Sequence, residues 1–170
     1  MTRAFVGVGS NIDPGQNVER ALRLLAVQAS IVKISTVYRT EPELLLNQPW
    51  YYNCVAEIAT ELCSEELKFA VLRGIEKKLG RKRTQDRYAS RPIDLDLLWY
   101  GDSSLETTGV VSPDPEIFKR PYLAAALMEL SPNLEPLLAA VAAEGASQKM
   151  QPLEDYTRSL REGILHACKH

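Results

Sequence analysis

The apolar segments of this chain follow an order that few folds can accommodate. Residues 4–9 are short, apolar and partly β-branched, which predicts a strand. The segments after it are a helical pattern that begins at Pro14, strands at 31–38 and 52–60, a helical pattern over 64–79, and a strand at 93–100. The resulting βαββαβ order predicts an α+β ferredoxin-like sandwich, an antiparallel sheet with helices packed on it.

Local signals set the expected ends of these elements. Asp13 before Pro14 and Ser64 before the second helix are typical N-cap residues, and Gly80 is typical of a helix end. Two later helices are expected at 121–130 and 156–165, as C-terminal additions to the sandwich. Residues 1–170 are interpreted as one domain, in which residues 133–170 form an extension whose elements the helical pattern defines least.

The overall composition excludes several classes of protein. Apolar residues make up 45% and charged residues 25% of the chain, which is ordinary for a globular protein. A net charge of −2 gives no general attraction to nucleic acids or anionic membranes, and no apolar run approaches the length of a membrane span. Three cysteines without a paired spacing and the absence of a secretion-type N-terminus favour the reducing cytoplasm.

Two aspartates alternate with apolar residues in the strand at 93–100. A strand has a side-chain period of two, so Asp94 and Asp96 lie on one face and the apolar residues on the other. Adjacent carboxylates repel unless a cation lies between them, and hard oxygen ligands suit magnesium. The alternative is a charged strand face that only prevents aggregation.

A basic loop comes directly before this strand. Its guanidinium groups can bind phosphate with two parallel hydrogen bonds; they belong to Arg81, Arg83, Arg87 and Arg91. Acids that hold magnesium beside cations that hold phosphate indicate phosphoryl transfer, in which positioning and charge neutralisation provide most of the catalysis. The alternative for the loop alone is a solvated surface cluster.

Common nucleotide-binding motifs are missing. The segment from Gly7 to Ile12 begins like a dinucleotide-binding turn but has Ile12 where the third glycine should stand, and the chain contains no phosphate-binding G-x-x-x-x-G-K-[S/T] loop. The sequence therefore predicts neither a Rossmann protein nor a P-loop protein.

The segment Arg87-Tyr-Ala-Ser-Arg91-Pro-Ile-Asp94-Leu-Asp96-Leu-Leu98 resembles the signature of the 6-hydroxymethyl-7,8-dihydropterin pyrophosphokinase family. Other landmarks of that family occur in the same order: Gly9-Ser10-Asn11, Tyr38-Arg39-Thr40, Gln48-Pro49 with Asn53, Glu76 before Gly80-Arg81, and Arg120 with Tyr122. The resemblance extends over residues 4–132.

The resemblance implies that ATP donates a pyrophosphoryl group, that two Mg²⁺ ions assist, and that the pterin hydroxyl attacks the β-phosphorus while AMP leaves. It assigns the metals to Asp94 and Asp96 and the transferred phosphates to Arg81 and Arg91. The residues that it implies for nucleotide binding are Glu76, Arg83, Arg87, Tyr88, Leu97, Asp114 and Arg120.

For the pterin, the resemblance implies a slot between Tyr51 and Tyr122, with Asn53 bonded to the polar edge of the ring. Stacking on both faces and an amide that both donates and accepts suit a flat polar heterocycle. Groups around Thr40, Glu41 and Glu43 complete the implied site.

Two positions depart from the usual family pattern. Asp114-Pro115 stands where a histidine usually precedes proline, and an acid near a polyphosphate repels it unless a metal or an arginine intervenes. Ala89-Ser90 stands where the family usually has Gly-Pro. Two other functions remain open, namely a D-x-D nucleotide-sugar transferase and a catalytically silent ferredoxin-like binding module. The expected partners are ATP and the pterin, and the expected state is a monomer or a weak homodimer.

Overall fold

The computed structural model of the protein describes residues 1–42, 47–86, 89–102, 104–144 and 149–166. Its strands are β1 (Thr2–Ser10), β2 (Ser30–Ile34), β3 (Tyr38–Thr40), β4 (Tyr51–Thr60), β5 (Asp94–Tyr100), β6 (Leu105–Thr107), β7 (Val110–Ser112) and β8 (Met150–Pro152). Its helices are α1 (Pro14–Gln28), the π-helical segment η1 (Glu66–Leu72) that continues into α2 (Arg73–Lys78), the 3₁₀ segments η2 (Pro115–Phe118) and η3 (Pro132–Leu134), α3 (Pro121–Leu130), α4 (Glu135–Ala143) and α5 (Glu154–Leu165).

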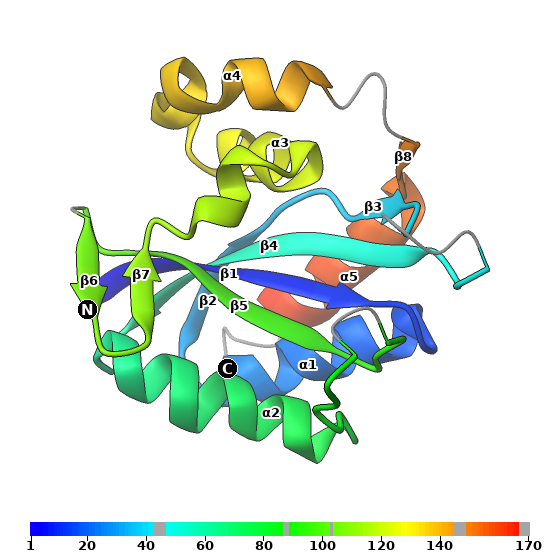
Figure 1. Cartoon of the computed structure of the whole chain (residues 1–170), viewed down its shortest axis with the longest axis horizontal. Coiled ribbons are helices and arrows are strands. Elements are labelled where there is room, and N and C mark those ends of the chain that lie inside the picture. Colours follow the sequence, from blue (N-terminus) through cyan, green and yellow to red (C-terminus); the bar gives the residue numbers. More distant parts are fainter. Residues whose placement is uncertain (43–46, 87–88, 103, 145–148, 167–170) are drawn as a thin grey trace.

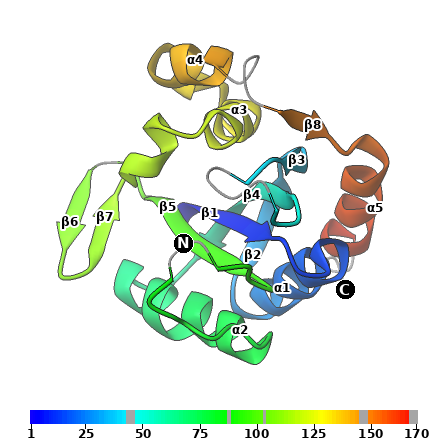
Figure 2. The same cartoon turned by 45° about the vertical axis from the view of Figure 1, so that its right-hand side comes forward.

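The main sheet has the order β5-β1-β4-β3-β8, with β2 also paired to β4, and every pairing is antiparallel. Helices α3 and α4 cover one face of this sheet, and α1, α2 and α5 lie on the other (Figures 1 and 2). The predicted βαββαβ ferredoxin-like sandwich is confirmed.

Alternation along β1 builds the two halves of the core. Val6 and Val8 point to the face that packs on α1, α2 and α5, whereas Phe5 points to the face that packs on α3 and α4. Leu98 of β5 and Val55 of β4 join Phe5 on that second face. Both faces are thus buried along the middle of the sheet, as expected when helices cover both sides.

The expected strand at 31–38 is two strands, β2 and β3. Between them, Ser35 bonds to β4 through one backbone group and its side-chain hydroxyl, in place of the regular backbone pairing. Its backbone N–H donates to the carbonyl of Val55 (2.9 Å), and its hydroxyl accepts the N–H of Val55 (2.9 Å). Val37 N–H instead donates to the hydroxyl of Thr157 in α5 (2.9 Å). The side chain of Ser35 therefore interrupts the pairing without leaving the buried backbone groups of Val55 unbonded.

The two predicted N-caps were wrong in their chemistry. Asp13 does precede α1, but its backbone is left-handed (φ 42°) and its side chain makes no capping hydrogen bond. Ser64 donates to the Glu65 carboxylate (2.7 Å), and the Glu66 carboxylate accepts the N–H of Cys63 (3.3 Å) at the start of the helical segment.

The later helices agree with the sequence better than the late strands do. Helix α3 has the predicted bounds, α5 begins two residues before the expected Tyr156, and α4 lies in the alanine-rich stretch. The β6–β7 hairpin and β8 were not predicted, since each strand has only three residues. Within the described ranges, no helix is both long and apolar enough to cross a bilayer.

Candidate active site

Two glycines of β1 form the middle of the candidate site. Gly7 pairs with Asp96, and Gly9 pairs with Asp94 on one side and with Asn53 on the other. Paired residues of antiparallel strands point to the same face, so the acids and the amide share the face that α3 covers. A Cβ atom at Gly9 would lie 2.6 Å from Oδ1 of Asn53, so the position has no room for a side chain. Strand β1 therefore separates an acid half, built on β5, from an amide half, built on β3 and β4.

The acid half contains both arginines that were assigned to the transferred phosphates. Arg91 Nη1 lies 3.0 Å from Oδ2 of Asp94, and Arg81 pairs with the other oxygen of Asp94 and with Glu76. Burial alone would lower the pKa of Arg81, but the carboxylates of Asp94, Glu76 and Asp96 outweigh it and raise that pKa. Carboxylates thus hold both guanidinium groups in the acid half.

Glu76 is the buried anchor of this half, with a side chain only 3% exposed. Its Oε1 accepts the N–H of Leu95, which lies between the two aspartates (2.9 Å), and its Oε2 accepts from Arg83 (2.9 Å). Arg81 N–H also donates to the carbonyl of Glu76 (3.0 Å). Protein groups occupy both oxygens, so Glu76 joins the basic loop to the acid strand.

Asp96 lies among other acids. Its side chain is accessible from the open side of the site, yet the surrounding protein displaces much of its water. This loss of hydration, followed by the charges of Asp94, Asp114 and Glu76, raises the pKa of Asp96 to about 7. A group in this state gains from any cation that replaces its proton.

The amide half places Asn53 next to Thr40. Asn53 Nδ2 donates to the Thr40 hydroxyl (2.7 Å), and both residues are buried. Tyr51 lies two residues before Asn53 and on the same face. Burial raises the pKa of Tyr51, and the positive charge of Arg91, together with its hydrogen bond, partly offsets that rise, so Tyr51 lies close to Arg91, where the two halves meet.

Comparison with known proteins identifies the family of this chain. The model of the 7,8-dihydro-6-hydroxymethylpterin-pyrophosphokinase family matches residues 5–132. The chain belongs to this family. It is 33% identical to the 2-amino-4-hydroxy-6-hydroxymethyldihydropteridine pyrophosphokinases of Aquifex aeolicus (79% of this chain, 83% of that one) and Bacillus subtilis (78% and 80%).

Other members of the pyrophosphokinase family are much longer than this chain. The chain is 35% identical to a folate synthesis bifunctional protein of Arabidopsis thaliana over 74% of its own length, but spans only 26% of that protein. A Plasmodium falciparum HPPK-DHPS structure has the same fold, with a TM-score of 0.63 at 11% identity, covering 86% of this chain and 45% of that one.

The remaining residues predicted to bind the nucleotide lie in different surroundings. Asp114 caps η2 by accepting the N–H of Glu116 (2.9 Å), and its charge reaches Asp96. Arg120 pairs with Glu116 (2.8 Å) and donates to the hydroxyl of Tyr122 (3.4 Å), which brings these two predicted residues together. The side chain of Leu97 is buried in the core on the opposite face, so only its backbone is available to a nucleotide on the site face.

Three predicted residues, Glu43, Arg87 and Tyr88, lie outside the described residues. Glu41 is described, and it is bonded to Lys149. Its N–H donates to the carbonyl of Lys149 (3.2 Å), and its carboxylate pairs with the Lys149 ammonium (3.4 Å). These bonds extend the pairing of β3 with β8.

The acid half fits a magnesium ion that takes some of its ligands from the protein and the others from a substrate. Among the described residues, no three His, Cys, Asp or Glu side chains converge as a metal cage. The carboxylates of Asp94 and Asp96 offer oxygen atoms on one face, and burial together with the neighbouring carboxylates raises the pKa of Asp96, so a cation there would be stabilised. Magnesium commonly takes one or two carboxylates and completes its shell with waters and phosphates.

The affinity for Mg²⁺ is expected to depend on pH near neutrality. Below the raised pKa of about 7, Asp96 holds a proton that the metal must displace, so the affinity should fall by up to about tenfold per pH unit as the pH drops from 7 to 5. Calorimetric titration with MgCl₂ at several pH values measures this slope. In Asp114→Asn, which removes one of the raising charges, the midpoint should move to lower pH. A flat profile in the wild type would contradict the assignment.

The sequence did not reveal one buried residue at the junction of the two halves. Asn11 was recognised as part of a turn and of a family landmark, yet it is 1% exposed and bonds to residues 38, 79 and 80 positions away. No periodicity or spacing signals partners at such separations; the glycines two and four residues before it were the local sign that the strand face there is occupied.

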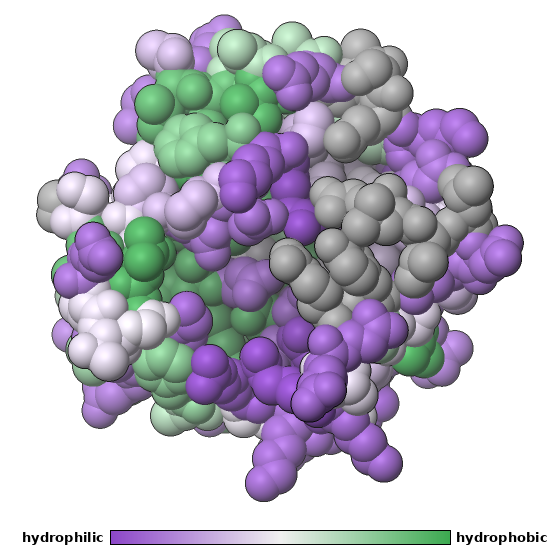
Figure 3. Space-filling view, viewed as in Figure 1, coloured by the Kyte–Doolittle hydropathy of each residue, from purple (hydrophilic) through white to green (hydrophobic). Residues whose placement is uncertain are grey.

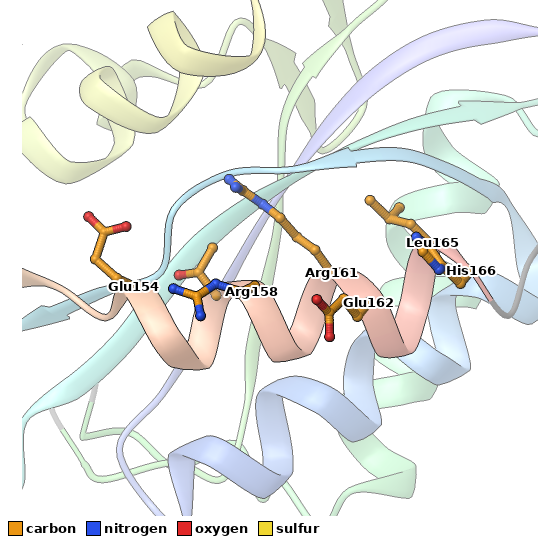
Figure 4. Close-up of a pocket in the computed structure, with 7 residues that line it drawn as sticks. Glu154, Arg158, Arg161, Glu162, Leu165 and His166 are labelled. Atoms are coloured by element: carbon orange, nitrogen blue, oxygen red, sulfur yellow. The ribbon is translucent and has the colours of Figure 1, made fainter.

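A separate pocket of about 260 Å³ lies along α5 (Figure 4). Its lining residues are Glu154, Thr157, Arg158, Arg161, Glu162, Leu165 and His166. The side chain of Arg161 extends from α5, donates to the carbonyl of Ile34 (2.8 Å) and pairs with Glu129 (2.6 Å). On the face shown in Figure 3, hydrophilic residues gather over the lower part of the molecule, where α2 and the loop after it lie. The pocket along α5 contains none of the residues that the sequence assigns to catalysis, metal or substrates.

Proposed function

We propose that this protein transfers the pyrophosphoryl group of ATP to the hydroxymethyl group of 6-hydroxymethyl-7,8-dihydropterin, giving the pterin diphosphate and AMP. Relatives of nearly the same length carry the name of this activity. The proposal includes a cytoplasmic location. It also includes a monomer or weak homodimer, and light scattering on the purified protein tests this oligomeric state.

The observation that carries the proposal is the pair of half-sites on either side of Gly9. The acid half offers two carboxylates with two guanidinium groups, which suits magnesium and a polyphosphate. The amide half offers an amide and an aromatic ring, which suits a flat polar heterocycle. One glycine separates them, so a hydroxyl on the heterocycle and a phosphate can meet above β1.

In the proposed reaction the pterin hydroxyl oxygen forms a bond to the β-phosphorus, and the bond from that phosphorus to the oxygen bridging it to the α-phosphorus breaks. AMP leaves with the electron pair, and the hydroxyl proton passes to solvent. Arg81 and Arg91 would move from Asp94 to the transferred phosphates and neutralise their charge. Two Mg²⁺ ions, held by Asp94 and Asp96, would supply further charge neutralisation when bound.

For the pterin, we propose stacking between Tyr51 and Tyr122, with the edge of the ring bonded to Asn53. The donor of Asn53 is already directed to Thr40, and its Oδ1 lies over Gly9. Oδ1 is therefore the atom that would accept a ring N–H. This arrangement would bind the ring in a single orientation.

Product analysis tests the function directly. The purified protein is mixed with ATP, MgCl₂ and the hydroxymethyl pterin, and AMP and the pterin diphosphate are separated by chromatography. Both products in equal amounts support the proposal. ADP, or no turnover, would refute it; binding of the pterin without turnover would favour the silent binding module.

Asp114 is expected to weaken MgATP binding through its charge. At about 6 Å and an effective dielectric of about 20, one charge contributes roughly 3 kcal/mol before screening. Asp114→Asn keeps a side-chain acceptor for η2 and removes the charge, so it should bind MgATP several-fold more tightly by calorimetry. Asp114→His, which adds a donor but loses this cap, should also gain affinity, and both gains should shrink in high salt. Unchanged or weaker binding would show that Asp114 supports the site instead.

A further inference from the structure

Asn11 follows the end of β1 and uses its whole side chain to join distant segments. Its Oδ1 accepts the N–H of Arg91 (2.8 Å), and its own N–H donates to the carbonyl of Arg91 (3.2 Å). Its Nδ2 donates to the carbonyl of Pro49 (3.4 Å) and to the hydroxyl of Ser90 (3.2 Å). A primary amide offers two donor hydrogens and one carbonyl acceptor, so each of these groups has a protein partner.

The two segments that Asn11 joins lead into the two half-sites. Pro49 lies two residues before Tyr51, at the start of the amide half. Arg91 ends the basic loop and pairs with Asp94 in the acid half (3.0 Å). The path from one half to the other through the side chain of Asn11 therefore consists of hydrogen bonds to backbone and to one hydroxyl.

A buried asparagine at this turn could serve the turn alone, and Asn17 provides that comparison. Asn17 is also buried (7% exposed), and its Nδ2 donates to the carbonyl of Ile12 (2.7 Å), which also accepts from Ser10 (3.0 Å). These contacts stay within the turn and reach neither half-site. Asn11 differs from Asn17, because the partners of its side chain all lie in other segments of the chain.

The lengths of the bonds also differ. The bond to Arg91 is of ordinary length, whereas the two bonds from Nδ2 lie at or beyond the long end of the usual range for N–H···O. Hydrogen bonds of this length can shorten when substrates draw the segments together. The Ser90 hydroxyl is an acceptor that the usual Gly-Pro at 89–90 would not provide.

We propose that Asn11 is a positioning residue that couples the two half-sites, so that a nucleotide in the acid half strengthens binding of the heterocycle in the amide half. The inference rests on the proposed function, which supplies both ligands. Coupling of this kind is reciprocal, so the heterocycle tightens the nucleotide by the same factor.

The test compares the Kd of hydroxymethyl pterin with and without magnesium and α,β-methylene-ATP, whose carbon bridge prevents transfer. The ratio of the two Kd values is the coupling factor. In the wild type it should exceed about 5, within the usual range for coupled sites. In Asn11→Ala it should fall to within about twofold of 1, while the Kd of the pterin alone changes less.

Three further variants locate the effect. Asn11→Asp keeps the acceptor for Arg91 and loses both donors, so its coupling factor should fall although the Arg91 bond remains. Ser90→Ala, on an exposed loop residue, removes one acceptor and should lower the factor in part, even if Asn11→Ala fails to fold. Asn17→Ala is the matched control and should keep the wild-type factor.

The outcomes separate this inference from the proposed function. A wild type that forms AMP but has a coupling factor of 1, or a factor that survives both Asn11→Ala and Ser90→Ala, overturns the inference and leaves the function intact. An equal loss in Asn17→Ala also overturns it, because the effect would then belong to the turn. A wild type that binds no pterin overturns both.

Discussion

Replacing Asp94 or Asp96 by alanine is expected to lower kcat for AMP formation by about 10³-fold or more, on the scale of losing one charge-stabilising group in other enzymes. Each variant removes one proposed oxygen ligand from the acid pair on the site face of β5. Calorimetry should show weaker Mg²⁺ binding in both. The exposed Asp155→Ala on α5 is the control and should keep full activity.

The two variants should differ in stability, because the two acids have different neighbours. Asp94 is paired with Arg81 and Arg91, so its loss leaves both without this partner and should destabilise the metal-free protein. Asp96 has a raised pKa, so its charge opposes folding. That cost is absent below the ordinary aspartate pKa of 3.8 and grows as the pH rises toward about 7.

Asp96→Asn should therefore raise the melting temperature of the metal-free protein more at pH 8 than at pH 5. Thermal denaturation at the two pH values measures the difference. Near-normal turnover of either aspartate variant in saturating magnesium would contradict the metal assignment. A lower melting temperature for Asp96→Asn at pH 8 would contradict the raised pKa of Asp96.

Arg81→Ala and Arg91→Ala are expected to lower kcat by about 10²–10³-fold, with a smaller effect on the Kd of MgATP. Both guanidinium groups pair with Asp94 in the structure, so moving them to phosphate would exchange one favourable pairing for another. Little net ground-state affinity results, and the benefit appears when charge develops during transfer.

Single-turnover kinetics together with calorimetry separate the two quantities. Lysine at either position keeps the charge but loses the planar fork, and should recover only part of kcat. Arg73→Ala is the control, since Arg73 lies over the Phe69 ring (4.3 Å) on the opposite face. A loss confined to MgATP affinity would place these arginines in ground-state binding.

Alternation and helical periodicity predicted the central fold because each strand and helix buries one face over several residues. The Asp94–Asp96 spacing placed both acids on one face, and the strand register confirms it. The split at Ser35 escaped prediction because a serine side chain took over a backbone bond of Val55. Three-residue strands such as β8 escaped because they have too few residues for a period.

Contacts between segments far apart in the chain could not be predicted from the sequence, for a different reason. Glu76 was assigned to the nucleotide, yet its carboxylate is occupied by Arg81, Arg83 and the N–H of Leu95. Such partners depend on how α2 docks on β5, which no local pattern specifies. The placement of the predicted ligand contacts relative to bound substrates stays a prediction.

The glycine strand between the half-sites also has an evolutionary consequence. Residues that would select the heterocycle lie on β3 and β4, and residues that would handle phosphate and metal lie on β5 and in the loop between α2 and β5. Changes of substrate shape can therefore accumulate on one side of β1 while the transfer chemistry on the other side is inherited unaltered. Gly9 lies between the two sides, and its position has no room for a larger residue.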